Sequence, residues 1–141
     1  MTYDIYTDGY RGPYGQCHIG VSIHDGSSEV YFLSQPIGKA TSMVAELLAF
    51  FTGLEKAVEL GIRKVKCHVD AMSIAHWYKG TAGMHKPNMR AIWRRIIEFI
   101  DDNDIEICTV EYIPSKQNKR ADALSKAAGT AETPFQRKWT V

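Results

Sequence analysis

The sequence predicts an α/β domain built on a mixed five-stranded sheet. Three strand-like segments come first, and after them helical segments alternate with two further strands. The first three strands follow one another closely enough to pair as an antiparallel meander. Helices separate the last two strands from the earlier ones, and such right-handed crossovers give parallel strands. We therefore expect three antiparallel strands, then two parallel ones, with helices flanking the sheet.

Size and charge fit one globular domain. The chain has 141 residues, 45% of them hydrophobic, with 17 Lys and Arg against 16 Asp and Glu. This composition excludes a disordered chain, a collagen-like repeat or a supercharged nucleic-acid-binding arm. The net charge of +1 indicates no particular partner, so binding to nucleic acid would need local clusters of basic residues. We expect one domain over residues 1–128 and a flexible tail over 129–141.

Alternating apolar and polar residues predict the antiparallel strands. Residues 3–7 form the first, followed by a loop rich in Gly and Tyr over 9–15. Every second residue of 17–23 is apolar, as in a strand with one buried face. A Gly-Ser turn at 25–28 joins it to a third strand over 29–33, so these two strands should form a hairpin.

Helical spacing of apolar residues predicts the remaining elements. Thr41 or Ser42 can cap the start of the main helix, whose apolar positions run from Val44 to Val58, and Gly61 ends it. The remaining expected elements, in chain order, are a strand over 65–69, a short helix over 71–78, a long helix over 87–100, a strand over 105–112 and a helix over 117–128.

Four acidic residues stand at the ends of these elements. Asp8 ends the first strand and Asp70 the fourth, while Glu46 and Asp122 lie in the first turns of helices. Each has a structural explanation when taken alone: Asp8-Gly9 is a turn signal, Asp70 can cap a helix, and the helix dipole favours the other two. Ligands of such folds bind where neighbouring strands end, so we expect the four carboxylates to converge at one edge of the sheet.

Carboxylates that lie so close repel one another unless cations are bound. Oxygen ligands without His or Cys suit Mg²⁺ or Mn²⁺. Two such ions, typically about 3.5–4 Å apart, carry out in-line phosphoryl displacement, because one activates the attacking water and the other neutralises the leaving 3′ oxygen. The four acids therefore point to a nuclease-like reaction.

Four segments of the chain resemble the motifs of type 1 ribonuclease H. They are residues 5–9 (IYTDG), 40–47 (ATSMVAEL), 68–70 (HVD) and 118–125 (NKRADALS). The resemblance extends from about residue 2 to 128, and it implies the ribonuclease H-like fold. It also implies endonucleolytic cleavage of the RNA strand of an RNA/DNA hybrid, leaving a 3′-hydroxyl and a 5′-phosphate. The metal-binding and catalytic residues that it implies are Asp8, Glu46, Asp70 and Asp122, holding two Mg²⁺ ions, with Mn²⁺ as an alternative.

Several positions depart from the pattern of that family. Tyr10 stands where a small residue is usual, Met43 replaces an Asn that contacts the RNA 2′-hydroxyl, and Ala71 replaces a Ser. Residues 112–117 are a short segment without the His that many members carry there, and the basic helical insertion of larger members is absent. Both features are similar to short archaeal and plant-like forms. The residues expected to contact the substrate are Gly9, Tyr10, Thr41, Met43, Lys116 and Asn118.

Basic residues form two clusters in the sequence, and an acidic block lies over residues 101–111. The cluster near Asp122 flanks the predicted site and should hold phosphates, whereas the other is explained equally well as a solvated helix face. Without a basic insertion, binding should be weaker and more sensitive to salt than in forms that carry one, with log K falling by about 0.7–0.9 per phosphate contact for each log unit of salt. The clusters are Lys86, Arg90, Arg94 and Arg95, and Lys116, Lys119, Arg120 and Lys126.

We expect a cytoplasmic monomer that does not enter membranes. The longest apolar stretch is far short of the roughly 20 residues that span a bilayer, and no secretory signal is evident. Cys17, Cys67 and Cys108 lie far apart and should be buried free thiols. Two alternatives remain open: a hybrid-binding module without catalysis, and a related nuclease of the same fold that acts on DNA or double-stranded RNA.

Overall fold

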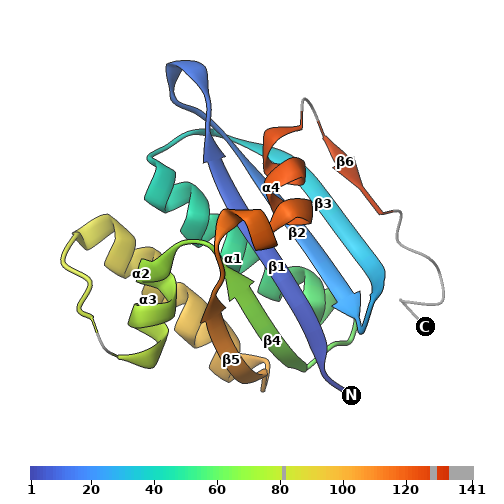
Figure 1. Ribbon diagram of the computed structural model, residues 1–141. Helices are drawn as coiled ribbons and strands as arrows, with labels where there is room; N and C mark the ends of the chain where they lie inside the picture. Colours follow the sequence, from blue (N-terminus) through green and yellow to red (C-terminus); the bar gives the residue numbers. More distant parts are fainter. Residues whose placement is uncertain (81, 128–129, 134–141) are drawn as a thin grey trace.

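The computed structural model describes residues 1–80, 82–127 and 130–133 (Figure 1). None of the helices within these ranges is long and apolar enough to cross a membrane. In chain order the elements are β1 (Tyr3–Arg11), a 3-10 turn (Pro13–Gly15), β2 (Gln16–Asp25), β3 (Ser28–Lys39), α1 (Ser42–Glu59), β4 (Lys64–Val69), α2 (Met72–Lys79), α3 (Pro87–Asp102), β5 (Glu106–Tyr112), a second 3-10 turn (Ser115–Gln117), α4 (Lys119–Lys126) and β6 (Ala131–Glu132).

The strands form one mixed sheet in the order β5-β4-β1-β2-β3-β6. Strands β1, β2 and β3 pair antiparallel, and β4 lies parallel to both β1 and β5, which confirms the predicted α/β class and mixed sheet. The sheet has six strands and not the expected five, because β6 pairs antiparallel with β3. A strand of two residues shows no alternation in sequence, so no pattern could predict it. The rest of the expected tail, residue 129 and residues 134–141, lies outside the described residues.

Strand β1 is longer than predicted, and this changes the position of Asp8. It continues to Arg11, and Asp8 lies opposite Gly20 of β2. The interpretation of Asp8-Gly9 as a hairpin turn is therefore wrong, since β2 pairs with β1 along this whole segment. Parallel pairing of β1 with β4 stops at Thr7 and Val69, so Asp8 lies just beyond the point where β4 ends.

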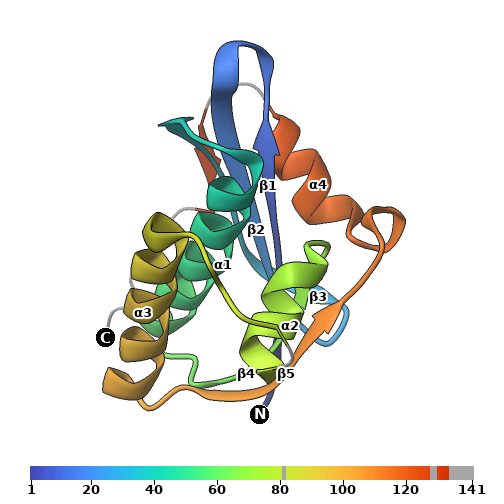
Figure 2. The same ribbon diagram turned by 90° about the vertical axis from the view of Figure 1, so that its left-hand side faces the viewer.

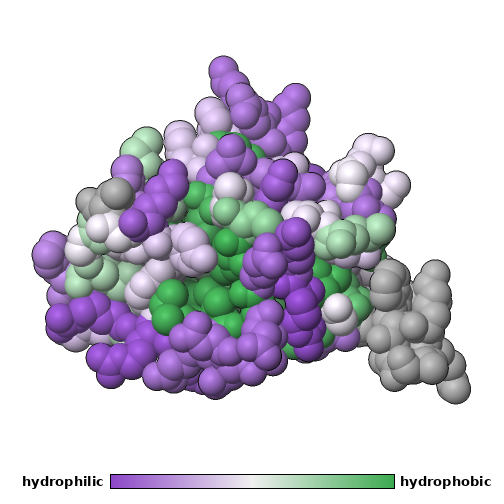
Figure 3. All heavy atoms as spheres, turned by 90° about the horizontal axis from the view of Figure 1, so that it is seen from below, coloured by the Kyte–Doolittle hydropathy of each residue, from purple (hydrophilic) through white to green (hydrophobic). Residues whose placement is uncertain are grey.

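Helices cover both faces of the sheet. Viewed edge-on, α1 and α3 lie on one side and α4 on the other (Figure 2). The main core lies between the sheet and α1 and α3, and includes Val21, Phe50, Leu54 and Ile96. From the end where β1 and β4 begin, apolar atoms gather in the middle of the molecule within a hydrophilic rim (Figure 3). The apolar core thus supports the sheet from the α1 side, while α4 is a small separate layer.

The cysteines are free thiols, but only two of the three are buried. Cys17 and Cys67 are buried, whereas Cys108 is exposed. The β4–β5 pairing is irregular beside Cys108, because Val65 pairs with Ile107 and the next residue, Lys66, pairs with Thr109. Cys108 is the extra residue of this bulge, so the alternation that predicted a buried side chain does not apply there.

Two glycines on adjacent strands let helices approach the sheet very closely. A Cβ atom added at Gly9 would lie 2.4 Å from the carbonyl carbon of Ala45 in α1. One added at Gly20 would lie 2.3 Å from the carbonyl oxygen of Ala121 in α4. Because Gly9 directly follows Asp8 and Gly20 lies opposite it, both helices pack tightly on the sheet beside Asp8.

We predict that Gly20→Ala lowers the free energy of unfolding by at least about 1–3 kcal/mol, the range expected when extra atoms are forced into a packed site. Denaturant unfolding followed by circular dichroism measures the effect. Gly83→Ala is the control, because a Cβ there would meet only the side chain of His85, at 3.4 Å. Equal unfolding midpoints for the two variants would show that α4 does not pack on Gly20 as described.

Candidate active site

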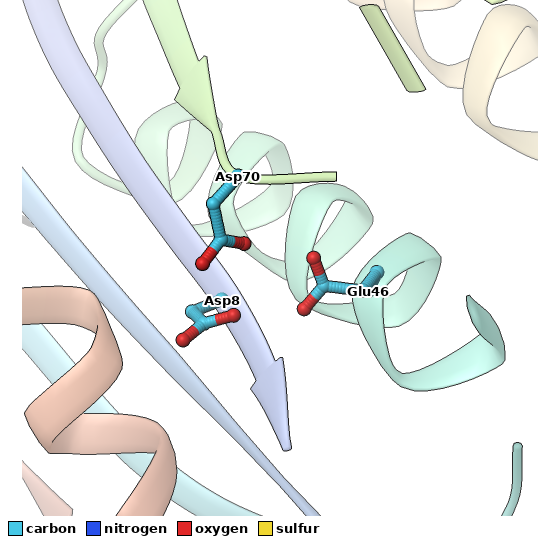
Figure 4. Close-up of side chains that lie close together, drawn as sticks. All are labelled: Asp8, Glu46 and Asp70. Atoms are coloured by element: carbon cyan, nitrogen blue, oxygen red, sulfur yellow. The ribbon is translucent and has the colours of Figure 1, made fainter. Parts of the chain in front are cut away.

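Three of the four predicted acids come together in the structure. Asp8 lies in β1, Glu46 in α1, and Asp70 directly after β4. Each offers a carboxylate oxygen, and these oxygens lie within 4.8 Å of one another. The three carboxylates point toward a common centre (Figure 4). We call Asp8, Glu46 and Asp70 the carboxylate cluster.

Glu46 is held in the cluster by the backbone of β1. The Gly9 amide donates a hydrogen bond to Glu46 Oε1. This bond is possible because Gly9 has no side chain to keep α1 away from the strand. The start of α1 is fixed by Thr41, whose Oγ1 accepts a hydrogen bond from the Val44 amide at 3.2 Å. Gly9, predicted to contact substrate, thus also positions a cluster carboxylate.

Asp70 takes no part in capping a helix. The N-cap residue of α2 is Ala71, and no side chain caps that helix. Asp70 Oδ2 instead accepts a hydrogen bond from Ser115 Oγ, at 3.1 Å. The expectation that Asp70 could serve as a cap is therefore wrong, and its carboxylate is available to the cluster. Ser115 was not predicted as a site residue, because a contact across 45 positions leaves no local pattern in the sequence.

Asp122 lies beside the cluster but outside it. Its carboxylate pairs with Lys126, four residues later in α4, at 3.2 Å. It remains close enough to Asp8 to contribute to the raised pKa of that group. The predicted set of four converging acids is therefore three acids and a neighbour, and the carboxylate of that neighbour pairs with a lysine one helical turn away.

A buried serine connects α4 to the cluster. Ser125 is fully buried, and its Oγ lies 3.2 Å from Asp8 Oδ2 and 2.7 Å from the Asp122 carbonyl oxygen. Ser125 lies in the last of the four motif-like segments, residues 118–125, but is not among the residues predicted for the site. Since buried hydroxyls need hydrogen-bond partners, a serine one helical turn after Asp122 was the signal that could have identified it.

The cluster is electrostatically strained when no cation is bound. Burial raises the pKa of Glu46, and hydrogen bonding to Asp8 and the charges of Asp8 and Asp70 raise it further. Burial also raises the pKa of Asp8, with a further contribution from the charge of Asp70, although a hydrogen bond with Glu46 opposes the rise. A divalent cation would relieve this repulsion. The donor set fits one, because it consists of hard carboxylate oxygens without His or Cys.

The predicted substrate-contacting residues differ in exposure. Tyr10 and Lys116 are exposed, whereas Met43 is half-buried and packs against the core. Asn118 is only 1% exposed, and its Nδ2 donates to the Thr7 carbonyl oxygen at 3.0 Å. Asn118 therefore joins the start of α4 to β1 immediately before Asp8, whatever contact it makes with substrate.

The basic cluster around Asp122 is partly neutralised. Arg120 donates two hydrogen bonds to Glu29, at 2.8 and 3.0 Å, which tie α4 to β3. Lys126 pairs with Asp122. Lys116 and Lys119 are exposed and form no ion pair within the described part of the chain. Of the four basic residues in this cluster, Lys116 and Lys119 are therefore the two without an ion pair among the described residues.

Comparisons with known proteins agree on the fold. Residues 7–128 match the model of a family described as reverse transcriptase-like. Ribonuclease H1 of the archaeon Halobacterium salinarum is 25% identical over 89% of this chain and 95% of its own, with a TM-score of 0.81. The N-terminal ribonuclease H domain of a Mycobacterium tuberculosis protein is 23% identical over 89% of this chain and 96% of its own, and its TM-score is also 0.81.

A third similar structure contains nucleic acid. LC11-RNase H1 in complex with an RNA/DNA hybrid is 28% identical over 86% of this chain and 92% of its own, with a TM-score of 0.79. A search of curated proteins gave no match. The predicted ribonuclease H-like fold is thus confirmed by solved structures.

We predict that the metal-free protein loses stability as the pH rises from about 4 to about 7. The pKa of Asp8 is raised from 3.8 to about 7 in the folded protein, so protonation of Asp8 stabilises the folded state. This stabilisation is complete below the pKa of the unfolded state and is lost as the pH rises through the pKa of the folded state. Asp8→Asn should reduce this dependence, with a part remaining because the pKa of Glu46 is also raised by burial, and should stabilise the metal-free protein at pH 7.5 by about 1–3 kcal/mol. Urea unfolding at several pH values in EDTA measures both effects.

The control is Asp25→Asn, which changes an exposed acid at the end of β2. It should leave the pH profile unchanged. An Asp8→Asn profile that is parallel to the wild-type profile would contradict the electrostatic strain described above.

Proposed function

Because the chain belongs to the reverse transcriptase-like family, we propose that it is a ribonuclease H that hydrolyses the RNA strand of RNA/DNA hybrids. The observation that carries the proposal is the carboxylate cluster, which brings three oxygen ligands together at the end of β4. A hybrid-bound ribonuclease H1 among the similar structures supports the substrate class. The products would be a 3′-hydroxyl and a 5′-phosphate.

Asp8, Glu46 and Asp70 would hold two divalent cations, Mg²⁺ or else Mn²⁺, and Asp122 would complete their coordination. When bound, such ions activate the attacking water and neutralise charge on the leaving oxygen. Because Asp122 pairs with Lys126, it can coordinate a cation only if one carboxylate oxygen is left free by that pair or if the pair opens. Gly9 and Ser115 keep two of the carboxylates in place through hydrogen bonds that are already formed.

The exposed residues around the cluster would bind the hybrid. Lys116 lies in the 3-10 turn before α4 and Lys119 is the first residue of α4, and both are exposed and free to contact phosphates. Tyr10, Thr41 and Met43 would contact the nucleotides near the cleaved bond. Asn118, being buried, would act through the backbone that it holds. The protein would work as a cytoplasmic monomer, and its free thiols are consistent with a reducing compartment.

We predict that Asp70→Asn lowers cleavage of an RNA/DNA hybrid by more than about 1000-fold, because a metal ion contributes several kcal/mol to stabilising the transition state. Asp122→Asn should cost less, about 10–100-fold, as expected for a residue beside the ligands. Cleavage of an end-labelled hybrid in Mg²⁺ measures the rates, and chelation by EDTA should abolish them.

Asp102→Asn is the matched control, an exposed acid in α3 remote from the cluster. Circular dichroism establishes that each variant is folded. Substantial hybrid cleavage by folded Asp70→Asn would refute the proposal. Faster cleavage of duplex DNA or duplex RNA than of hybrid by the wild type would assign the site to a different nuclease.

Charge placement gives a separate prediction about binding. In the inactive Asp70→Asn background, changing either Lys116 or Lys119 to Ala should reduce the slope of log K against log salt by about 0.7–0.9. Arg120→Ala should change the slope much less, since its guanidinium is already paired with Glu29. Fluorescence anisotropy with labelled hybrid at several salt concentrations measures the slope.

Lys64→Ala serves as the control, because Lys64 lies at the opposite end of β4 and pairs with Glu106. Equal effects of Lys64→Ala and Lys119→Ala would mean that the start of α4 is not the phosphate-binding surface.

A further inference from the structure

The Ser125 hydroxyl has one proton and two acceptors within hydrogen-bonding distance. A serine inside a helix usually satisfies its hydroxyl by donating to a backbone carbonyl of the preceding turn. Ser125 has that partner, the Asp122 carbonyl oxygen at 2.7 Å. Its second acceptor, Asp8 Oδ2 at 3.2 Å, belongs to a different element, 117 positions away, and shares the single hydroxyl proton with the Asp122 carbonyl oxygen. The hydroxyl thus connects α4 to a carboxylate of the cluster.

The backbone that carries Ser125 has little freedom to move relative to Asp8. A Cβ atom added at Gly20 would lie 2.6 Å from the Ser125 amide nitrogen, so this turn of α4 rests directly on β2. Gly20 is also the residue paired with Asp8 across the two strands. The donor and its carboxylate acceptor are therefore fixed to the same pair of strands, and their separation is set by the sheet.

The docking of α4 does not depend on the Ser125–Asp8 contact. Ser34 of β3 is fully buried and donates to the Leu124 carbonyl oxygen at 2.6 Å. Arg120 attaches the first turn of α4 to Glu29. Together with the bond from Asn118 to the Thr7 carbonyl oxygen, these contacts hold the helix on the sheet, and what Ser125 adds is a hydroxyl beside a cluster carboxylate.

We propose that Ser125 is a positioning residue for Asp8, restraining rotation of its carboxylate so that the cluster is ordered before a cation binds. This inference rests on the proposed function, because it assigns Asp8 to a cation. Groups that hydrogen-bond to metal ligands typically change metal affinity by about 10–100-fold when they are removed. Ser125 would therefore set the affinity of the site for its cation without contacting the substrate.

The test compares Ser125→Ala with Ser34→Ala. Both remove a fully buried hydroxyl at the interface of α4 with the sheet, but only the first removes a donor to a carboxylate. Isothermal titration calorimetry with MgCl₂, and with MnCl₂ as a second probe, measures cation affinity without substrate. The Mg²⁺ dependence of hybrid cleavage gives a second readout.

We expect Ser125→Ala to weaken cation binding about 10-fold and to raise the Mg²⁺ concentration for half-maximal cleavage by a similar factor. At saturating Mg²⁺ its kcat and its KM for hybrid should return close to wild-type values. Ser34→Ala should show a comparable fall in Tm but wild-type cation affinity. A merely structural role for Ser125 would instead give the two variants the same affinity.

Asp8→Asn separates failure of this inference from failure of the proposed function. Loss of cation binding in Asp8→Asn, together with wild-type affinity in Ser125→Ala, would overturn only the role of Ser125. Wild-type cation binding in Asp8→Asn would overturn the metal site itself, and the role of Ser125 with it.

Discussion

The site depends on how closely two helices can approach adjacent strands. At Gly9 and Gly20 a single added carbon would overlap the backbone of α1 or α4. These contacts place Glu46 and Ser125 against Asp8 from two separate helices. Burial by the same helices removes water from the carboxylates, which raises the pKa of Asp8 and of Glu46. Close packing and electrostatic strain at this edge therefore have one cause.

Such strain is tolerated because most of the apolar core lies elsewhere. The large buried side chains lie between the sheet and α1 and α3, among them Phe50, Leu54 and Ile96. The fold can therefore keep like charges together at the end of β4 at the expense of a part of its stability. A bound divalent cation would reverse the effect, since it would convert mutual repulsion into shared coordination and stabilise the folded state by mass action. Catalytic competence and folded stability would then respond to the same ion.

The order of strands and helices, the mixed sheet and three clustered acids could be predicted because they follow from local periodicity and from where elements end. What the sequence could not supply were contacts between distant positions. Asp8 lies within a strand because β2 pairs beyond it, and Asp122 pairs with Lys126 of its own helix. The hydrogen bonds from Ser115 and Ser125 likewise join segments whose approach only the folded sheet determines. Short hydroxyl side chains at such positions resemble ordinary polar residues in any local pattern.

These long-range contacts give α4 an importance beyond its length of eight residues. Asn118 holds its start to the Thr7 carbonyl oxygen, Ser125 bonds Asp8, and Asp122 lies between these two points of attachment. The cluster itself comes from β1, α1 and the end of β4, so those elements alone can bring three acids together. The docked α4 adds the Ser125 contact with Asp8 and supplies the fourth carboxylate. Cation binding and hybrid cleavage should therefore depend on α4 to different degrees, with the cluster providing the ligands and α4 determining how well they are ordered.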